Sequence, residues 1–517
     1  MAQQQQGTYA ASISPIDLPG WTGGLNREAD PFQLEGTESP DALNVDFELR
    51  GAVTKRSGYT KFSGSDGAAA KGISLVGWTT LAATKWLVFC DVAGDVFYMP
   101  ATVATALTDS TFNLGAGTAE REYQVANASL NNKLYLTSLK GDKAVRWDGT
   151  AWTQITKTAF DNTASRFPPA RSLVANNERF FAGNIENDVG TEFRSRVAWS
   201  AALDPEKWAA LDFIDFAPDN GQEITGMAVF AESVVVFKNR SMFVLAGTDA
   251  SNFTVYPLDP NLGTDCPGTI VNAGTELYFF DRLTGVWKYD GSNFKRVDDK
   301  INSYLLDNVN QANAYKATAF TYRNRYFLSV PWTSSTVNNR TFVYDPRITA
   351  WTEYDFGVAD AAQVDEIPYV VAPRDVVGIY RLFNGLSDNG ANITAYFDTY
   401  WVSPGGQALR NRIRHLDLAF SALGNYNIDV SMRRDFVSDF YRTKSINTTP
   451  GGSLWGFFNW GGLWGGLGVS EVLSRSSGWG DLWAVCQFRF AHTGQGSFSI
   501  NRMTLLASGR PRLRGLS

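Results

Sequence analysis

The sequence predicts an all-β protein: an irregular β-propeller of about seven blades, an extended N-terminal arm and a C-terminal antiparallel β-domain. Two observations support this prediction. Short apolar segments alternate with turn signals, and hardly any segment keeps a helical period over three turns. A hairpin of constant character also recurs at steps of 36 to 57 residues, which brackets the roughly 40–50 residues of a four-stranded blade.

The composition suits such a fold. The chain has 517 residues, more than the roughly 100–200 of an ordinary domain, but a propeller grows by adding blades around one axis. Hydrophobic residues make up 44% and aromatic residues 14%, and 47 glycines suggest many turns. The net charge of −6 argues against a protein that reads DNA sequence, although it does not exclude DNA passing nearby.

We expect no leader and no cofactor. The start Met-Ala-Gln-Gln-Gln-Gln lacks the basic and apolar regions of a signal peptide, and no apolar run is long enough to span a membrane. Cys90, Cys266 and Cys486 lie far apart, which predicts neither a disulfide framework nor a metal cluster. Reduced thiols suit assembly in a reducing cytoplasm.

Changes in composition divide the chain into three parts. Residues 1–49 are rich in Gly, Pro, Asn and acidic residues, and are predicted to form the extended arm. Residues 50–389 carry the repeated hairpins and are predicted to form the propeller. Residues 390–517 have another rhythm, with expected strands at 393–401, 410–420, 426–433, 488–490 and 498–506.

The hairpin is clearest at residues 133–152, where two apolar strands are followed by an Asp-Gly turn and a further aromatic residue. Asp-Gly supplies the positive φ that a tight turn needs, so the flanking aromatics should face each other across the turn. Related hairpins occupy 276–294 and 325–351, and weaker ones 86–98, 179–200, 234–245 and 368–380. Their third-strand aromatics are Phe97, Trp147, Trp199, Phe243, Trp287, Tyr344 and Tyr380.

This spacing predicts seven blades, with six or eight as alternatives. A series of β-sandwiches is the competing architecture, but it gives no reason for the same aromatic–turn–aromatic element to recur.

Two features of the C-terminal domain are candidate contacts between subunits. The Gly/Trp-rich loop 451–483 contains Trp455, Trp460 and Trp464, and either folds onto its own domain or inserts into a neighbouring subunit. The strand with Arg410, Arg412 and Arg414 either is a solvated edge strand protected by charge or meets an acidic surface on a partner.

The sequence shows no catalytic constellation. It has two histidines, His415 and His492, and no nucleophile, phosphate-binding or zinc motif, so we predict that the protein is not an enzyme. Paired carboxylates remain the enzymatic option, but Asp148, Asp290 and Asp345 are expected to be turn residues. Asp91 and the run Asp298-Asp299 are expected to be solvated.

The N-terminal block is more distinctive. It contains Gly23-Gly24-Leu25-Asn26, then Pro40-Asp41-Ala42-Leu43-Asn44-Val45, then Lys55-Arg56-Ser57-Gly58-Tyr59. This order resembles the opening of the tail nozzle proteins of short-tailed bacteriophages, also called tail tubular protein B or packaged-DNA stabilisation proteins. Trp199-Ser200 with Asp204-Pro205 and Trp208 resembles a further element of that family, and weaker likenesses extend over most of the chain.

The resemblance implies a structural virion protein, assembled in the host cytoplasm, whose homohexameric ring retains packaged DNA and lets it pass on ejection. The implied partners are further copies of the chain, tail adaptor or portal proteins, tail fibre or spike proteins, and double-stranded DNA in the lumen; no membrane insertion is implied. The family carries no catalytic residues. A glycan-binding or glycan-cleaving propeller of a tail adhesin is the alternative, and a cellular propeller scaffold is a third.

Overall fold

The computed structural model separates the chain into two compact units. The ring unit comprises residues 59–344 and 354–384, and the terminal unit comprises residues 1–58, 345–353 and 385–517. The structure describes residues 13–67, 69–114, 125–139, 144–162, 164–371, 373, 376–403, 409–423, 426–448, 471–480 and 482–511.

Seven four-stranded antiparallel sheets follow one another along the described part of the chain. The first three are β8 (Gly72–Thr79), β9 (Lys85–Asp91), β10 (Asp95–Pro100) and β11 (Thr108–Asn113); β12 (Val125–Leu130), β13 (Lys133–Ser138), β14 (Ala144–Trp147) and β15 (Trp152–Ile155); and β16 (Ala170–Asn176), β17 (Arg179–Glu186), β18 (Glu192–Trp199) and β19 (Phe213–Asp215).

The next three sheets are β20 (Ile224–Phe230), β21 (Ser233–Lys238), β22 (Met242–Ala246) and β23 (Thr254–Asp259); β24 (Val271–Asn272), β25 (Leu277–Asp281), β26 (Gly285–Tyr289) and β27 (Phe294–Arg296); and β28 (Thr318–Tyr322), β29 (Arg325–Val330), β30 (Arg340–Asp345) and β31 (Ala350–Tyr354). The seventh joins β32 (Asp360–Val364), β33 (Ile367–Val371) and β34 (Ile379–Leu382) to β7 (Tyr59–Lys61). Short helices between strands are η1 (Pro218–Asn220), η2 (Pro267–Thr269), α1 (Asn302–Asn308) and η3 (Ala314–Lys316).

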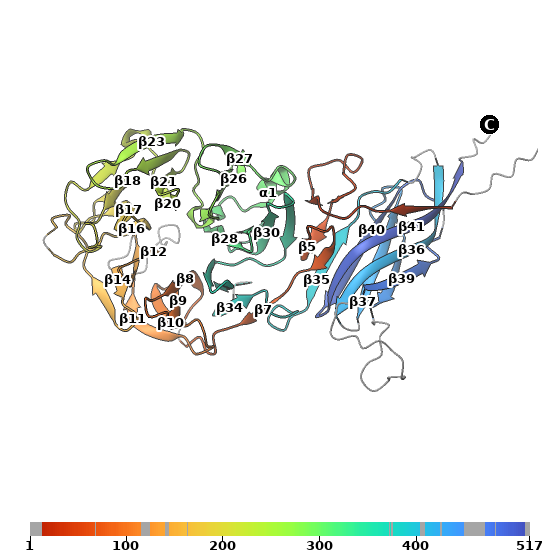
Figure 1. Ribbon diagram of the computed structural model, residues 1–517, viewed down its shortest axis with the longest axis horizontal. Helices are drawn as coiled ribbons and strands as arrows, with labels where there is room; N and C mark the ends of the chain where they lie inside the picture. Colours follow the sequence, from red (N-terminus) through yellow and green to blue (C-terminus); the bar gives the residue numbers. More distant parts are fainter. Residues whose placement is uncertain are drawn as a thin grey trace, which may run out of the picture. The chain divides into compact units, whose positions relative to one another are not determined.

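The sheets close into a ring (Figure 1). The first strand of each sheet contacts the first strand of the next, from β8 through to β32, and β32 contacts β8. The seventh sheet also takes its fourth strand from the other end of the unit, since Tyr380 of β34 pairs with Lys61 of β7. Buried side chains fill the spaces between neighbouring sheets, such as Phe89 and Leu75 against Tyr369 and Val371. The predicted propeller-like all-β fold is confirmed.

The predicted hairpins are confirmed as the second and third strands of the seven sheets, and the seven predicted aromatics lie on third strands. The stacking expected across the Asp-Gly turns is also present. The rings of Trp147 and Trp152 stack with centroids 4.8 Å apart, and those of Tyr289 and Phe294 with centroids 4.7 Å apart.

Five first-to-second-strand connections share a turn that the sequence analysis did not single out. Each has two central residues with positive φ, the type I′ geometry that matches the twist of a hairpin. The pairs are Asn131-Asn132, Asn177-Glu178, Ala231-Glu232, Arg323-Asn324 and Asp365-Glu366. These turns contain no glycine, which is why no Asp-Gly or Asn-Gly signal marks them.

The terminal unit contains two larger sheets. One has the order β39 (Glu471–Ser477), β36 (Leu409–Leu423), β41 (Ser497–Pro511), β6 (Val53–Lys55), β5 (Val45–Phe47), with β1 (Ile13–Asp17) also on β41. The other has the order β38 (Arg442–Asn447), β37 (Asn427–Arg434), β40 (Cys486–Gly494), β35 (Ile393–Asp398), β4 (Ala42–Leu43). β2 (Gly24–Leu25) and β3 (Glu38–Ser39) form a small parallel pair.

Two predicted boundaries differ from these units. Residues 13–49 do not remain a separate arm, because β1, β4 and β5 add to the sheets of the terminal unit and bury residues such as Val45 and Phe47. The predicted propeller start at residue 50 is also too early, since β6 pairs with β41. Strands of two to five residues carry too little periodicity to be recognised in the sequence.

Candidate interaction surfaces

The predicted turn carboxylates are held by backbone groups. Asp148 Oδ1 accepts hydrogen bonds from the N–H groups of Thr150 and Ala151, both at 2.8 Å, and Asp290 Oδ1 accepts those of Ser292 and Asn293. These backbone donors lower the pKa of both carboxyl groups below the usual value. Asp345 likewise accepts the N–H of Arg347. The prediction that these three acids serve turns is confirmed.

The predicted solvation of Asp91 and Asp298 is wrong. Asp91 is buried and accepts N–H groups of Ala70, Ala93 and Asp95. Asp298 is also buried, accepts the N–H of Val286 at 3.1 Å, and has a pKa raised by burial. Both acids satisfy backbone donors between strands, a role that depends on residues distant in the sequence.

His492 has structural contacts. Its Nδ1 lies 2.8 Å from the Asn427 carbonyl oxygen, its ring packs against Tyr426, and burial lowers its pKa. It borders a 340 Å³ pocket lined by Tyr426, Asn427, Asp429, Ser445, Ala491, His492 and Thr493. Within the described residues, no three His, Cys, Asp or Glu side chains are grouped as metal ligands would be. The three cysteines are buried and unpaired.

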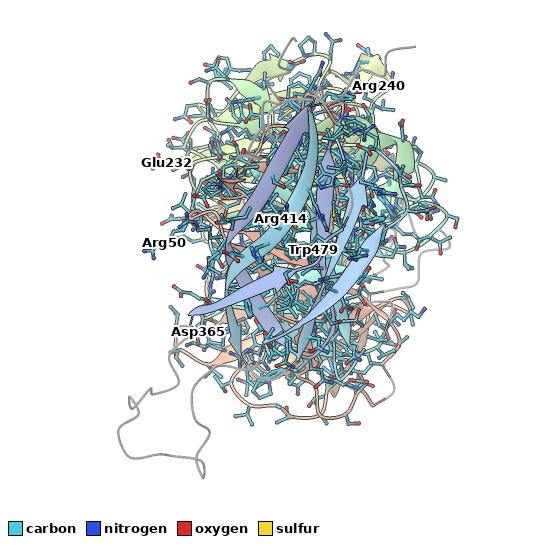
Figure 2. All side chains as sticks on the ribbon, turned by 90° about the vertical axis from the view of Figure 1, so that its right-hand side faces the viewer. Arg50, Glu232, Arg240, Asp365, Arg414 and Trp479 are labelled. Atoms are coloured by element: carbon cyan, nitrogen blue, oxygen red, sulfur yellow. The ribbon has the colours of Figure 1, made fainter. Side chains whose placement is uncertain are left out.

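The three predicted arginines lie at the start of β36. Arg412 and Arg414 are exposed and alternate with buried Asn411 and Ile413, while Arg410 is half-buried. The edge-strand interpretation holds only in part: β39 pairs with residues 415–421 of β36, and beside the arginines the outer side of β36 is bridged at Asn411, which exchanges two backbone hydrogen bonds with Trp483. The side chains of Arg412 and Arg414 therefore project from one face of a sheet. Figure 2 shows Arg414 on the side of the terminal unit that faces the viewer.

An aromatic turn lies beside Arg410. Arg410 Nη1 is 3.1 Å from Asp435 Oδ2, and Asp435 and Phe436 have φ values of 50° and 61° in the connection from β37 to β38. Such φ values are strained for a bulky residue such as Phe436. Asp435 stabilises the turn, because its Oδ1 accepts the Ala484 N–H at 2.7 Å and its own N–H bonds to Val485.

The turn presents apolar groups to solvent. Phe436 is 39% and Val437 51% exposed, and Phe32, 63% exposed, stacks on Phe436 with ring centroids 4.5 Å apart. A strained turn that exposes aromatics next to arginines has the composition of an interface rather than of an ordinary surface. We call Arg410, Arg412, Arg414, Phe436 and Val437 the arginine–aromatic surface.

The other predicted contact residues, Trp455, Trp460 and Trp464, lie outside the described residues. The end of that predicted loop differs from expectation, because residues 471–477 form β39 and pair with β36. Trp479 and Trp483 are each 1% exposed within the terminal unit. For these two tryptophans, folding onto their own domain is the interpretation that the structure supports.

The residues of the distinctive N-terminal block hold the terminal unit together. Arg56 Nη1 and Nη2 donate to the two oxygens of Asp388 at 2.8 and 2.7 Å, and its Nε donates to Asn44 Oδ1 at 2.7 Å. Arg56 and Asp388 are almost fully buried. Asp41 forms 2.6 Å ion pairs with Arg27 and Arg489, the second of which also binds Asp398.

Comparison with known proteins adds little. A scan against protein-family models and a search of the curated proteins gave no match. Among solved structures, the computationally designed Ika8 protein matches 62% of this chain over its full length, with 9% identity and a TM-score of 0.36.

PorZ, described as an essential surface component of the type-IX secretion system of Porphyromonas gingivalis, has 11% identity and a TM-score of 0.37. That match covers 75% of this chain and 46% of PorZ. Likenesses at this level carry no argument about function. In the described part of the chain, no helix is both long and apolar enough to cross a bilayer.

Proposed function

We propose that this chain is a tail nozzle subunit of a short-tailed bacteriophage, and that about six copies form a ring through which packaged DNA passes on ejection. The observation that carries this proposal is the N-terminal block. Its resemblance to the nozzle family falls on Asn44 and Arg56, which are buried at structural contacts of the terminal unit. Residues with such roles are the ones that members of a family would share.

The fold is compatible with this role. A ring of sheets plus a second unit of two sheets offers separate surfaces for neighbouring subunits, for an adaptor or portal protein, and for fibres or spikes. The net charge of −6 favours a lumen along which DNA slides without binding, because phosphate contacts require cationic side chains. The proposed location is the virion tail, after assembly in the host cytoplasm.

The test removes the chain from the phage that encodes it. Particles assembled without it should lose packaged DNA, measured as DNA that becomes accessible to nuclease, and supplying the chain in trans should restore retention. Particles that keep their DNA but fail to adsorb to cells would contradict the nozzle and favour the glycan-binding adhesin.

A further inference from the structure

One face of the ring unit is built from turns that are linked across neighbouring sheets. The Leu81 N–H donates to Asn132 Oδ1 at 2.6 Å, which joins the first sheet to the second. Asn131 Nδ2 donates to the Leu203 carbonyl at 2.6 Å, and the Leu203 N–H donates to the Glu178 carbonyl at 2.9 Å. These contacts place the first-to-second-strand turns of the first three sheets on one side of the ring, and we call the side that carries the first-to-second-strand turns the turn face.

The turn face exposes leucines on a firmly held backbone. Leu81 is 88% exposed and Leu203 is 58% exposed, and both backbones are fixed by the hydrogen bonds just described. A large apolar side chain displayed on an ordered turn loses little freedom when a partner covers it. Leu81 and Leu203 are therefore better suited to pack against a partner protein than to face solvent.

Acidic residues accompany the leucines. Four of the ten residues in the five type I′ turns are acidic, Glu178, Glu232, Asp365 and Glu366, and all four are exposed, whereas Arg323 is the basic one. Figure 2 shows Glu232 and Asp365 on the same side of the view, while Arg240, from the β21–β22 turn, lies on the opposite side. Asp365 is already paired with Lys85, so Glu178, Glu232 and Glu366 carry the acidic character for which a partner of this face would supply positive charge.

The terminal unit of the same chain carries a surface that offers positive charge and apolar side chains. The arginine–aromatic surface exposes Arg412 and Arg414 on β36. It also exposes Phe436 and Val437 on the turn that the Arg410–Asp435 ion pair joins to β36. The ring unit contains 28 Lys and Arg against 34 Asp and Glu, whereas the terminal unit contains 18 of each, so the acidic excess of the chain lies in the ring unit. The turn face and the arginine–aromatic surface thus carry opposite charges, and both expose apolar side chains.

We propose that the turn face of the ring unit in one copy binds the arginine–aromatic surface of the terminal unit in the next copy. This inference rests on the proposed ring of identical subunits. A closed ring requires two different patches that complement each other on successive subunits, and these two surfaces supply them. Arginine pairs with carboxylates in a fork geometry, and aromatics next to arginine are the typical centres of interfaces.

The test reverses charge on each surface and then on both. Arg412→Glu with Arg414→Glu, and separately Glu178→Arg with Glu232→Arg, should each abolish multi-copy assembly of the full chain, measured as mass in solution with and without adaptor. The chain carrying all four changes should assemble again. An equimolar mixture of the two reversed chains should also assemble, because each mutant surface then finds its complement on the other chain.

The control is Arg240→Glu, an exposed arginine on the opposite side of the ring unit, which should leave the mass unchanged. Near-ultraviolet circular dichroism establishes that every variant is folded. Reversed variants that assemble like the parent would overturn the inference while leaving the proposed function intact. The inference also fails if each reversal abolishes assembly but their combination does not restore it.

Two other outcomes separate the alternatives. A parent chain that stays monomeric alone and with adaptor would contradict the proposed function itself. Binding of labelled duplex DNA that the parent shows and the Arg412→Glu, Arg414→Glu variant loses, without any change in assembly, would assign the arginines to nucleic acid instead and overturn the inference.

Discussion

The Arg56–Asp388 ion pair is a buried contact of single residues within the terminal unit. Both side chains are out of contact with water, and three hydrogen bonds fix the guanidinium between Asp388 and Asn44. Arg56→Met leaves the Asp388 carboxylate buried without its cation. We expect a loss of about 3–5 kcal/mol in the free energy of unfolding of the terminal unit, measured by urea denaturation.

The matched control for Arg56 is Arg50→Ala, because Arg50 is exposed in the same segment (Figure 2). That change should stay within about 0.5 kcal/mol of the parent. Adding Asp388→Leu to Arg56→Met should recover part of the loss, since the uncompensated charge is then gone. Equal stability of parent and Arg56→Met would show that the pair does not hold the unit together.

A second prediction at this scale concerns pH. Asp360 of β32 accepts the N–H groups of Leu75 in β8 and of Ala361, and burial raises its pKa from 3.8 to about 6. The folded chain therefore binds this proton more tightly than the unfolded chain. The contribution of Asp360 to stability is least favourable above pH 6 and improves as pH falls towards 4.

Asp360→Asn removes the titrating carboxyl group. Any effect of the substitution that does not depend on pH shifts the unfolding free energy equally at every pH. Between about pH 7.5 and about pH 4.5, the parent should gain about 2 kcal/mol of unfolding free energy relative to the variant. Parallel stability profiles of the two proteins would show that Asp360 does not titrate in this range. Urea denaturation at several pH values provides the measurement.

Some residue roles could be predicted from the sequence, and others could not. Asp148 and Asp290 were predictable as turn residues because the glycine that follows each marks a local turn. Asp91 and Asp298 were not, because burial depends on strands that lie far away in the sequence. The exposed Phe436 was also missed, since its strained conformation is maintained by contacts of Asp435 with residues 484 and 485.

At the scale of elements, the positive φ values of the type I′ turns predict how glycine substitutions change the stability of the ring unit. Ala231 has a φ of 47° in the exposed turn between β20 and β21, a conformation that glycine adopts without strain. Ala231→Gly should therefore raise the unfolding free energy of the ring unit by about 0.5–1 kcal/mol. Thermal unfolding monitored by circular dichroism measures the gain.

The comparison for Ala231 is Ala228→Gly, three residues earlier within β20. There the added backbone freedom has no strain to relieve, so the change should lower stability by about 0.5–1 kcal/mol. Opposite signs for the two substitutions support the turn geometry. A loss at both positions would contradict it.

The hairpins of the second and third strands were predictable because aromatic residues and Asp turns mark them repeatedly. Their first strands were harder to recognise, since turns such as Asn131-Asn132 and Ala231-Glu232 lack glycine. How far the outer side of β36 is covered was also not predictable. Its alternation of arginine with buried residues is the same for an edge strand and for an interior strand with one face exposed.

At the scale of the whole molecule, the seven-sheet ring was predictable because a hairpin of the same character recurs seven times, although the steps between copies vary from 36 to 57 residues. The allocation of the first 58 residues to the terminal unit was not, because pairings such as β1 with β41 join opposite ends of the chain. No short-range pattern encodes such a pairing. The tail nozzle function stays a prediction at this scale, and it makes a definite claim about assembly.

The most direct measurement is the mass of the purified protein in solution, alone and after mixing with the adaptor or portal protein of the same virion. The account predicts a closed assembly of about six chains, formed either spontaneously or on the adaptor, as expected for a closed heterologous ring. A stable monomer that ignores the adaptor and binds glycans would contradict the nozzle and support the adhesin.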